Sequence, residues 1–121
     1  MDYKDIKFID AKLYIKITSS NTILTLTNMN GNVFVTISAG SVGAKKTKRS
    51  LEYFAQLTID KILKKLNQLN ITRLILFLNG VGKNKFVCIK RLKEANIQIF
   101  KIIDTTQIPH GGCRKKKLRR L

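Results

Sequence analysis

The residues best suited to metal or nucleophile chemistry are the single histidine and the two cysteines. His110 and Cys113 form an H-x-x-C pair with metal-ligand spacing, and Cys88 lies well before them. A zinc site needs three or four ligands, so one pair does not define one. A Cys–His nucleophilic site is no better supported, because nothing in the sequence orients the pair. We predict no metal, no cofactor and no catalytic residue, and a core position for Cys88.

The acidic residues do not form a catalytic group either. A two-metal nuclease needs a cluster of carboxylates. Here the candidates are scattered, and none lies in the interior of the first three predicted strands: Asp10, Glu52, Asp60, Glu94 and Asp104. An active nuclease is therefore not expected.

Basic residues gather in a glycine-containing loop at residues 40–49. Its candidate phosphate contacts are Lys45, Lys46, Lys48 and Arg49, followed by Ser50. Glycines let backbone N–H groups approach phosphates, and the loop feeds a predicted helix N-terminus, where anions are favoured. The alternative is a solvated loop that happens to be basic. We favour phosphate binding.

A second candidate loop spans residues 79–84 (NGVGKN). Gly80 and Gly82 form a G-x-G that lacks the third glycine and the downstream acid of a dinucleotide fingerprint, so a tight turn is the favoured interpretation. Lys83 and Lys85 make the loop a second candidate phosphate contact.

The end of the chain, CRKKKLRRL, is the most basic segment. Its bases are Arg114, Lys115, Lys116, Lys117, Arg119 and Arg120. Lysines would make point-charge contacts with phosphates, and the arginines could add bidentate or stacking contacts. A solubilising or targeting tail is the alternative, and a membrane-surface role is disfavoured because only two leucines could insert. No aromatic run of the RNP type is present, so base stacking on a sheet face is not the obvious mode.

Length and charge set the frame for these segments. The chain has 121 residues and a net charge of +17, with a pI near 10.3. This length suits one domain, and a folded domain this basic usually has a polyanionic partner, with nucleic acid as the first candidate. Two cysteines suggest a reducing compartment. No stretch is apolar enough to span a membrane, and MDYKDIKFID does not resemble a targeting peptide.

Hydrophobic periodicity supplies the elements that would position these segments. Alternation predicts strands at 12–18, 22–28 and 33–38, and three- and four-residue steps predict a helix capped by Ser50 and ending near 69. A strand covered on both faces (71–78), a helix (85–95) and a last strand (97–103) follow. The order β-β-β-α-β-α-β predicts an α/β fold with right-handed parallel crossovers. We divide the chain into segment 1–11, domain 12–103 and extended tail 104–121.

Several stretches together resemble one family, the small-ribosomal-subunit protein numbered eleven. They occur in the family's order and at its spacing: NTILTLTNMNGN (21–32), SAGSVGAKKTKRSLEYFAQ (38–56), NGVGKNK (79–85) and DTTQIPHGGCR (104–114). The match runs from about Tyr14 to the end of the chain. The hairpin and tail motifs are the most specific, and jointly the four are strong evidence.

The resemblance implies a ribonuclease H-like three-layer fold with a mixed five-stranded sheet, without catalytic acids. It implies a structural role on the small-subunit platform, binding rRNA near the messenger exit and E site, beside small-subunit proteins eighteen, twenty-one and seven. The family's RNA contacts carry over to the first loop (Lys45, Lys46, Lys48, Arg49, Ser50), to the second (Gly80, Gly82, Lys85), and to His110, Gly111, Gly112, Arg114 and the basic run. The runner-up is a free-standing nucleic-acid-binding module or a degenerate ribonuclease H-like nuclease.

The sequence also departs from the family pattern. The family usually has Pro where Glu52 stands and Phe where Ala44 stands, and Gly111-Gly112 replaces its common Asn-Gly. The family's basic N-terminal extension is shortened to a mixed-charge segment. This short start, the absent transit peptide and the abundance of Lys, Ile and Asn resemble an organelle-encoded copy. We expect a mitochondrial ribosome, with a plastid or the bacterial cytoplasm as alternatives.

Overall fold

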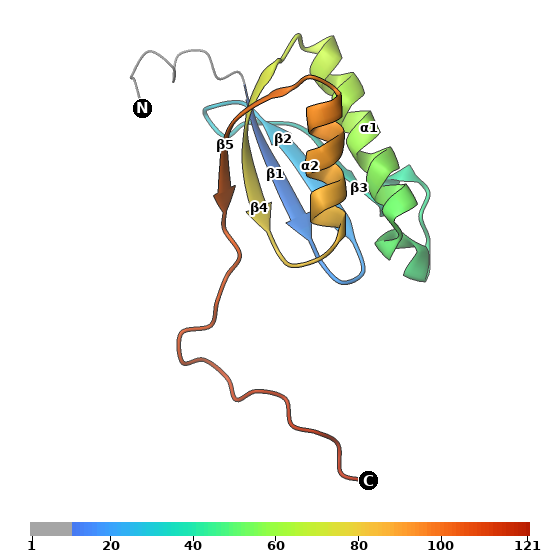
Figure 1. Ribbon diagram of the computed structural model, residues 1–121, viewed down its shortest axis with the longest axis vertical. Coiled ribbons are helices and arrows are strands. Elements are labelled where there is room, and N and C mark those ends of the chain that lie inside the picture. The colour runs from blue at the N-terminus through green and yellow to red at the C-terminus, as the bar shows by residue number, and fades with distance from the viewer. Residues whose placement is uncertain (1–10) are drawn as a thin grey trace.

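The computed structural model describes residues 11–121 (Figure 1). Most of the predicted segment 1–11 therefore lies outside the described residues. The elements follow the predicted order: β1 (Ala11–Ile17), β2 (Thr22–Thr27), β3 (Val33–Ser38), α1 (Glu52–Gln68), β4 (Arg73–Asn79), α2 (Asn84–Glu94) and β5 (Gln98–Asp104). Each boundary lies within about two residues of the one that hydrophobic periodicity predicts.

The five strands form one mixed sheet in the order β3-β2-β1-β4-β5. The first three strands pair antiparallel, as a meander does, while β4 runs parallel to both β1 and β5. Parallel neighbours need a crossover, which α1 and α2 supply. The α/β class and the mixed five-stranded sheet are thus confirmed.

The hydrophobic core lies between the two helices and one face of the sheet. Alternate residues of β1 are fully buried there, and β4 shows the same alternation. Each helix contributes an apolar stripe to this core, including Ile59, Ile62 and Leu66 of α1 and Cys88 and Leu92 of α2. The predicted core position of Cys88 is confirmed, and burial raises the pKa of its thiol to about 12.

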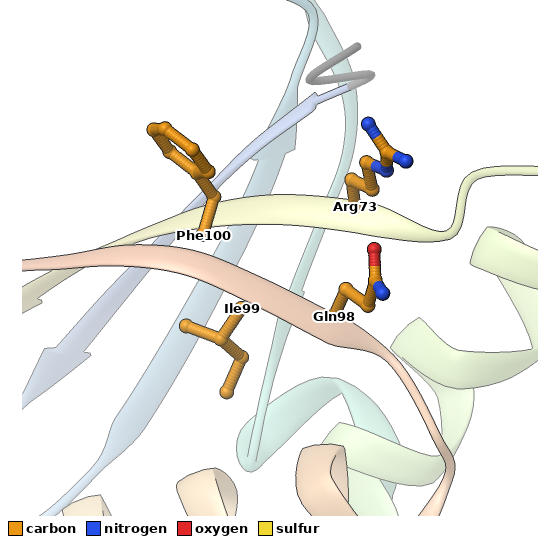
Figure 2. A pocket seen from close by; sticks show the side chains of 4 residues that line it. All are labelled: Arg73, Gln98, Ile99 and Phe100. Carbon is orange, nitrogen blue, oxygen red and sulfur yellow. The ribbon is translucent and has the colours of Figure 1, made fainter. Parts of the chain in front are cut away.

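Both helices pack on the same face of the sheet, so the expected three-layer arrangement is wrong for residues 11–121. The crossovers β3–α1–β4 and β4–α2–β5 step toward the same sheet edge, and two right-handed crossovers in one direction place both helices on one side. The prediction that 71–78 is covered on both faces is wrong for the same reason. Figure 2 shows Ile99 pointing toward the helices, while Arg73 and Phe100 point to the opposite face of the sheet.

The start of α1 also differs from the prediction. Leu51, not Ser50, precedes the helix, and no side chain caps it. The Ser50 hydroxyl instead donates to the carbonyl of Thr47, 2.9 Å away, within a short 3-10 helix, Lys46–Ser50. The predicted irregular loop therefore contains two 3-10 turns, because Gly40–Val42 forms another.

After β5 the chain leaves the domain as an extended segment with neither helix nor strand (Figure 1). Residues 107–121 are exposed throughout. Among the residues described, no helix has the length and apolarity that crossing a membrane requires.

Candidate nucleic-acid interface

The basic loops and the start of the tail meet at the end of the sheet where β1, β4 and β5 terminate. Strands β1, β4 and β5 are parallel, so their carboxyl ends lie together, and the residues that follow them cluster there. A hollow of about 260 Å³ at this end is lined by three segments: 17–19, Ser50–Leu51 and 81–84. The Asn84 side-chain amide joins two of them by donating to the Ser50 carbonyl, 3.1 Å away. We call this region the loop edge.

The first loop presents its lysines to solvent from a fixed backbone. Lys45, Lys46 and Lys48 are exposed, and Arg49 is half-buried. The Arg49 Nε donates to the Lys46 carbonyl, 3.1 Å away, and Lys46 itself has a φ of 53°. The turn therefore holds several positive charges close together without a carboxylate to neutralise them within the described loop.

Close packing against the end of β1 explains the two glycines of the second loop. At Gly80, with a φ of +101°, a Cβ would overlap the carbonyl oxygen of Ile17, and at Gly82 it would lie 2.8 Å from the Ile17 side chain. These two positions press the loop against the end of β1. Because glycine has no side chain, the predicted RNA contacts of Gly80 and Gly82 would involve the backbone.

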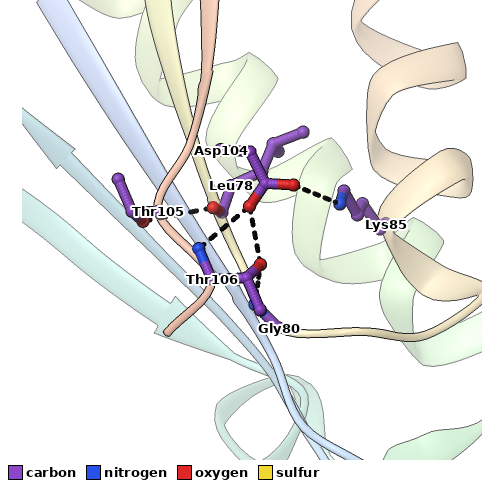
Figure 3. A network of polar contacts seen from close by, with 6 residues as sticks. All are labelled: Leu78, Gly80, Lys85, Asp104, Thr105 and Thr106. Atoms are coloured by element: carbon purple, nitrogen blue, oxygen red, sulfur yellow. Dashed lines mark hydrogen bonds and ion pairs between the residues drawn. The ribbon is translucent and has the colours of Figure 1, made fainter. Parts of the chain in front are cut away.

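A polar network ties the tail to the loop edge (Figure 3). Asp104 accepts hydrogen bonds from the Thr106 hydroxyl, 2.6 Å away, and from the Thr106 N–H, 2.9 Å away. The Thr106 hydroxyl oxygen also accepts from the Gly80 N–H, at 3.1 Å. The neighbouring Thr105 binds the Leu78 carbonyl through its N–H, at 2.7 Å. These bonds fix where the tail departs.

Asp104 also engages one of the predicted RNA-binding lysines. Lys85 Nζ lies 3.5 Å from Asp104 Oδ2, and its side chain is only 19% exposed, so part of its charge is compensated within the protein. The hydrogen bonds from Thr106, and secondarily the charge of Lys85, lower the pKa of Asp104 below its ordinary value of 3.8. Lys83, the residue immediately before α2, is exposed.

The remaining predicted contacts lie on the tail and are exposed. They are His110, Gly111, Gly112, Arg114, Lys115, Lys116, Lys117, Arg119 and Arg120. The structure brings the start of the tail to the loop edge, but it does not bring these residues together with Lys45–Arg49. Within residues 11–121, His110 and Cys113 join no group of three or more side chains able to hold a metal ion.

Local sequence patterns do not single out Asn84, Thr105 and Thr106 as part of the site. Asn84 links the two loops, and the two threonines link the tail to β4 and its loop. All three lie inside the quoted stretches NGVGKNK and DTTQIPHGGCR, which is the signal that could have singled them out. Their roles depend on contacts between segments distant in sequence, which no local pattern shows.

A basic α/β domain with a mixed five-stranded sheet, whose loops and tail present cations at the carboxyl ends of the parallel strands, has the features of a nucleic-acid-binding protein. The sequence pattern of the family described as Ribosomal protein S11 matches residues 12–120. This chain belongs to that family, as the quoted motifs predict.

Bacterial relatives agree with the assignment. The chain is 38% identical to small ribosomal subunit protein uS11 of Kosmotoga olearia, over 90% of this chain and 84% of the relative. It is 36% identical to the uS11 protein of Thermotoga maritima over 98% and 91%, and 40% identical to that of Carsonella ruddii over 90% and 92%. Membership of a family of ribosomal proteins confirms the prediction that the chain is not an enzyme.

Proposed function

We propose that the chain is a structural constituent of the small ribosomal subunit that binds small-subunit rRNA. The match to the S11 family across residues 12–120 carries this proposal. The cationic loops and the start of the tail converge at the loop edge, which agrees with this proposal. rRNA is a polyanion, and binding it depends on neutralising its phosphates.

The proposed mechanism is electrostatic and geometric. Lys45, Lys46 and Lys48 neutralise phosphates from a turn that the packed domain holds in place, and backbone N–H groups near Ser50 and Gly82 approach the RNA closely. The tail, residues 104–121, extends the contact beyond the domain. Its exposed bases, Arg114 to Arg120, would reach phosphates far from the sheet.

The finer placement is part of the same proposal. We place the protein on the platform of the subunit, near the messenger exit and E site, with messenger RNA nearby. Its proposed neighbours are the small-subunit proteins numbered eighteen, twenty-one and seven. The basis is the family's motifs, present here at 21–32, 79–85 and 104–114. Crosslinking with mass spectrometry in assembled subunits identifies these neighbours directly.

For the compartment we propose a mitochondrial ribosome, on the abundance of Lys, Ile and Asn, whose codons are AT-rich. The relatives named above are bacterial, so the bacterial cytoplasm and a plastid are the alternatives. Locating the gene on an organellar or a bacterial genome distinguishes the three.

Sedimentation tests the main proposal. The full chain, expressed with an affinity tag in its own host, is expected to co-sediment with small subunits in gradients containing high salt. A loosely associated cationic protein would be stripped under these conditions, since salt weakens phosphate contacts. Recovery only from the free soluble pool would instead indicate a free-standing nucleic-acid-binding module. Magnesium-dependent RNA cleavage abolished by Asp104→Asn would indicate a degenerate nuclease fold that has kept activity.

A further inference from the structure

The sheet face opposite the helices carries an organised pattern of side chains. Paired residues on neighbouring strands project to the same face, so the strand register defines rows across the sheet. The central row crosses all five strands: Thr36, Thr25, Tyr14, Phe77 and Ile103. We call the surface built on this row the open face.

An aromatic pair occupies the middle of the open face. Tyr14 and Phe77, directly opposite each other on β1 and β4, stack with ring centroids 4.6 Å apart and planes 14° from parallel. Tyr14 is 38% exposed, although it lies in the central strand of the sheet. Its neighbour on the other side is Thr25, which has a small side chain.

Lysines flank this aromatic pair on both sides. One adjacent row contains Lys12, Ile75 and Lys101, and the other contains Ile23, Lys16 and Asn79. Two residues along a strand separate neighbouring rows by roughly 6.6 Å. Lys12 Nζ already lies 5.9 Å from the centre of the Phe77 ring, within cation–π range. The open face thus combines exposed aromatic surface with cations.

Acidic residues are placed elsewhere. The carboxylates described within residues 11–121 belong to α1 (Glu52, Asp60), to α2 (Glu94) and to the end of β5, where Asp104 turns toward Lys85 of α2. On the helix side they form ion pairs, such as Asp60 with Arg91, 2.7 Å apart. No described carboxylate lies in the three rows, so the lysines there are not neutralised by the sheet itself.

The geometry points to a second RNA-binding surface: we propose that the open face binds unpaired nucleotides of RNA. One base would stack beside Tyr14 over Thr25, and Lys12 and Lys16 would contact the phosphates on either side of it. Aromatic rings serve this purpose on other sheet faces because every base has a π-face and unpaired bases can be splayed out. The proposal rests on the proposed function and adds a surface separate from the loop edge and tail.

The outer end of the open face offers a further place for a base. A hollow of about 410 Å³ there is lined by Phe100, Gln98, Ile99 and Arg73 (Figure 2). A bulge in the pairing of β4 and β5 falls between Leu74 and Ile75 and brings Phe100 to the open face. The strand thus presents an aromatic side chain there beside Lys101, which pairs with Ile75. RNA crossing the central row would reach this hollow next.

Two matched variants of the full chain test the proposal. Tyr14→Leu keeps apolar bulk but removes the ring, whereas Tyr53→Leu removes a more exposed ring, 62% exposed, from α1 on the helix side. The probe is a twelve-nucleotide single-stranded oligouridine. We expect Tyr14→Leu to weaken binding about tenfold, the usual cost of losing one stacking partner, and Tyr53→Leu to leave binding unchanged. Equal affinities for wild type and Tyr14→Leu would overturn the proposal.

A second variant covers the case in which Tyr14→Leu unfolds the domain, which a urea titration would reveal. Lys12→Gln with Lys16→Gln leaves the buried core unchanged and removes two charges, one of them the cation over the Phe77 ring. It should lower the salt-dependence slope for the oligouridine by roughly 1.4, at about 0.7 for each single-strand phosphate contact. An unchanged slope would mean that these lysines meet no phosphate and would contradict the proposal.

The occupant inside the ribosome is identified by placing benzoylphenylalanine at position 14 and irradiating purified small subunits. Crosslinks to rRNA support the proposal. Crosslinks to a ribosomal protein, to a second copy, or to residues 1–10 of this chain would overturn it. This outcome is separable from failure of the proposed function, because in that case the tagged chain would not sediment with small subunits at all.

Discussion

At the scale of single residues, the candidate site depends on glycines, which lack side chains and so let two segments approach closely. Gly80 lets β4 turn away beside the end of β1, where any Cβ would overlap the Ile17 carbonyl oxygen. Family resemblance assigns this glycine to RNA binding, and the packing assigns it to holding the loop edge in shape. The Gly80 N–H itself donates to the Thr106 hydroxyl, so the two roles are compatible where the RNA contacts use the other backbone groups of the loop.

Gly80→Ala should therefore destabilise the domain before it affects RNA directly. The substitution combines a positive φ with a backbone overlap, and we expect a loss of about 3 kcal/mol or more in the free energy of unfolding, measured by urea titration. Gly31→Ala is the matched control. Gly31 has a similar φ of +96° but nothing within 4 Å of the position of its Cβ, so only the φ cost of about 1 kcal/mol remains. Equal losses for both would show that the approach to Ile17 does not matter.

At the scale of elements, alternation along a strand predicts which residues face the core but not what covers the other face. The alternating segment 12–18 correctly predicts the buried side of β1. The apolar residues Ile75 and Phe77 make β4 look like a strand covered on both sides, yet they lie on the open face. Which face a crossover helix covers follows from strand order, and strand order depends on pairings between distant segments.

For the same reason, the sequence alone does not predict the aromatic pair. Tyr14 and Phe77 lie on strands far apart in the chain, and only the parallel pairing of β1 with β4 places them side by side. The helix start was misplaced for a local reason, because the Ser50 hydroxyl bonds back to Thr47 instead of capping α1. The loop edge itself was predictable, because its residues follow the ends of strands that the β-α-β order makes parallel.

The junction between β5 and the tail supports a prediction about protonation. Hydrogen bonds from Thr106 lower the pKa of Asp104, so its ionised form favours the tethered tail. This tether is complete above pH 3.8 and is lost as the pH falls through the lowered pKa of the folded state. In Thr106→Val, the pKa of Asp104 should move back toward 3.8, and the Gly80 N–H should exchange faster because it loses its acceptor. A carbon-detected NMR titration and hydrogen exchange measure both.

Thr105→Val is the control for this junction. Its hydroxyl donates to the Leu78 carbonyl, 3.1 Å away, and makes no contact with Asp104. The pKa of Asp104 should therefore stay at its wild-type value in this variant. If both variants shift it equally, Thr106 does not hold the carboxylate as the structure shows.

At the scale of the whole molecule, the bases that give the net charge of +17 lie on several surfaces. Only some of these bases form ion pairs with described carboxylates. On the helix side, Asp60 and Glu94 share Arg91, and Asp104 engages Lys85. The lysines of the first loop, Lys12 and Lys16 of the open face, and the bases of the tail form no ion pair with a described carboxylate. Carboxylates thus compensate part of the positive charge on the helix side, while no described carboxylate pairs with the bases of the first loop or the tail.

This division predicts that equal numbers of charges removed from different surfaces have unequal effects. Changing Lys45, Lys46, Lys48 and Arg49 to Gln should lower the slope of log affinity against log salt for small-subunit rRNA by about three, if each base meets one phosphate. Changing Lys61, Lys64 and Lys65 of α1 together with Lys93 of α2 to Gln should leave the slope nearly unchanged, because these four lysines lie on the helix side. Filter binding over a range of salt concentrations measures both slopes. Similar decreases for the two variants would mean that RNA affinity depends only on the total charge of the protein. The loop edge would then have no special role in RNA binding.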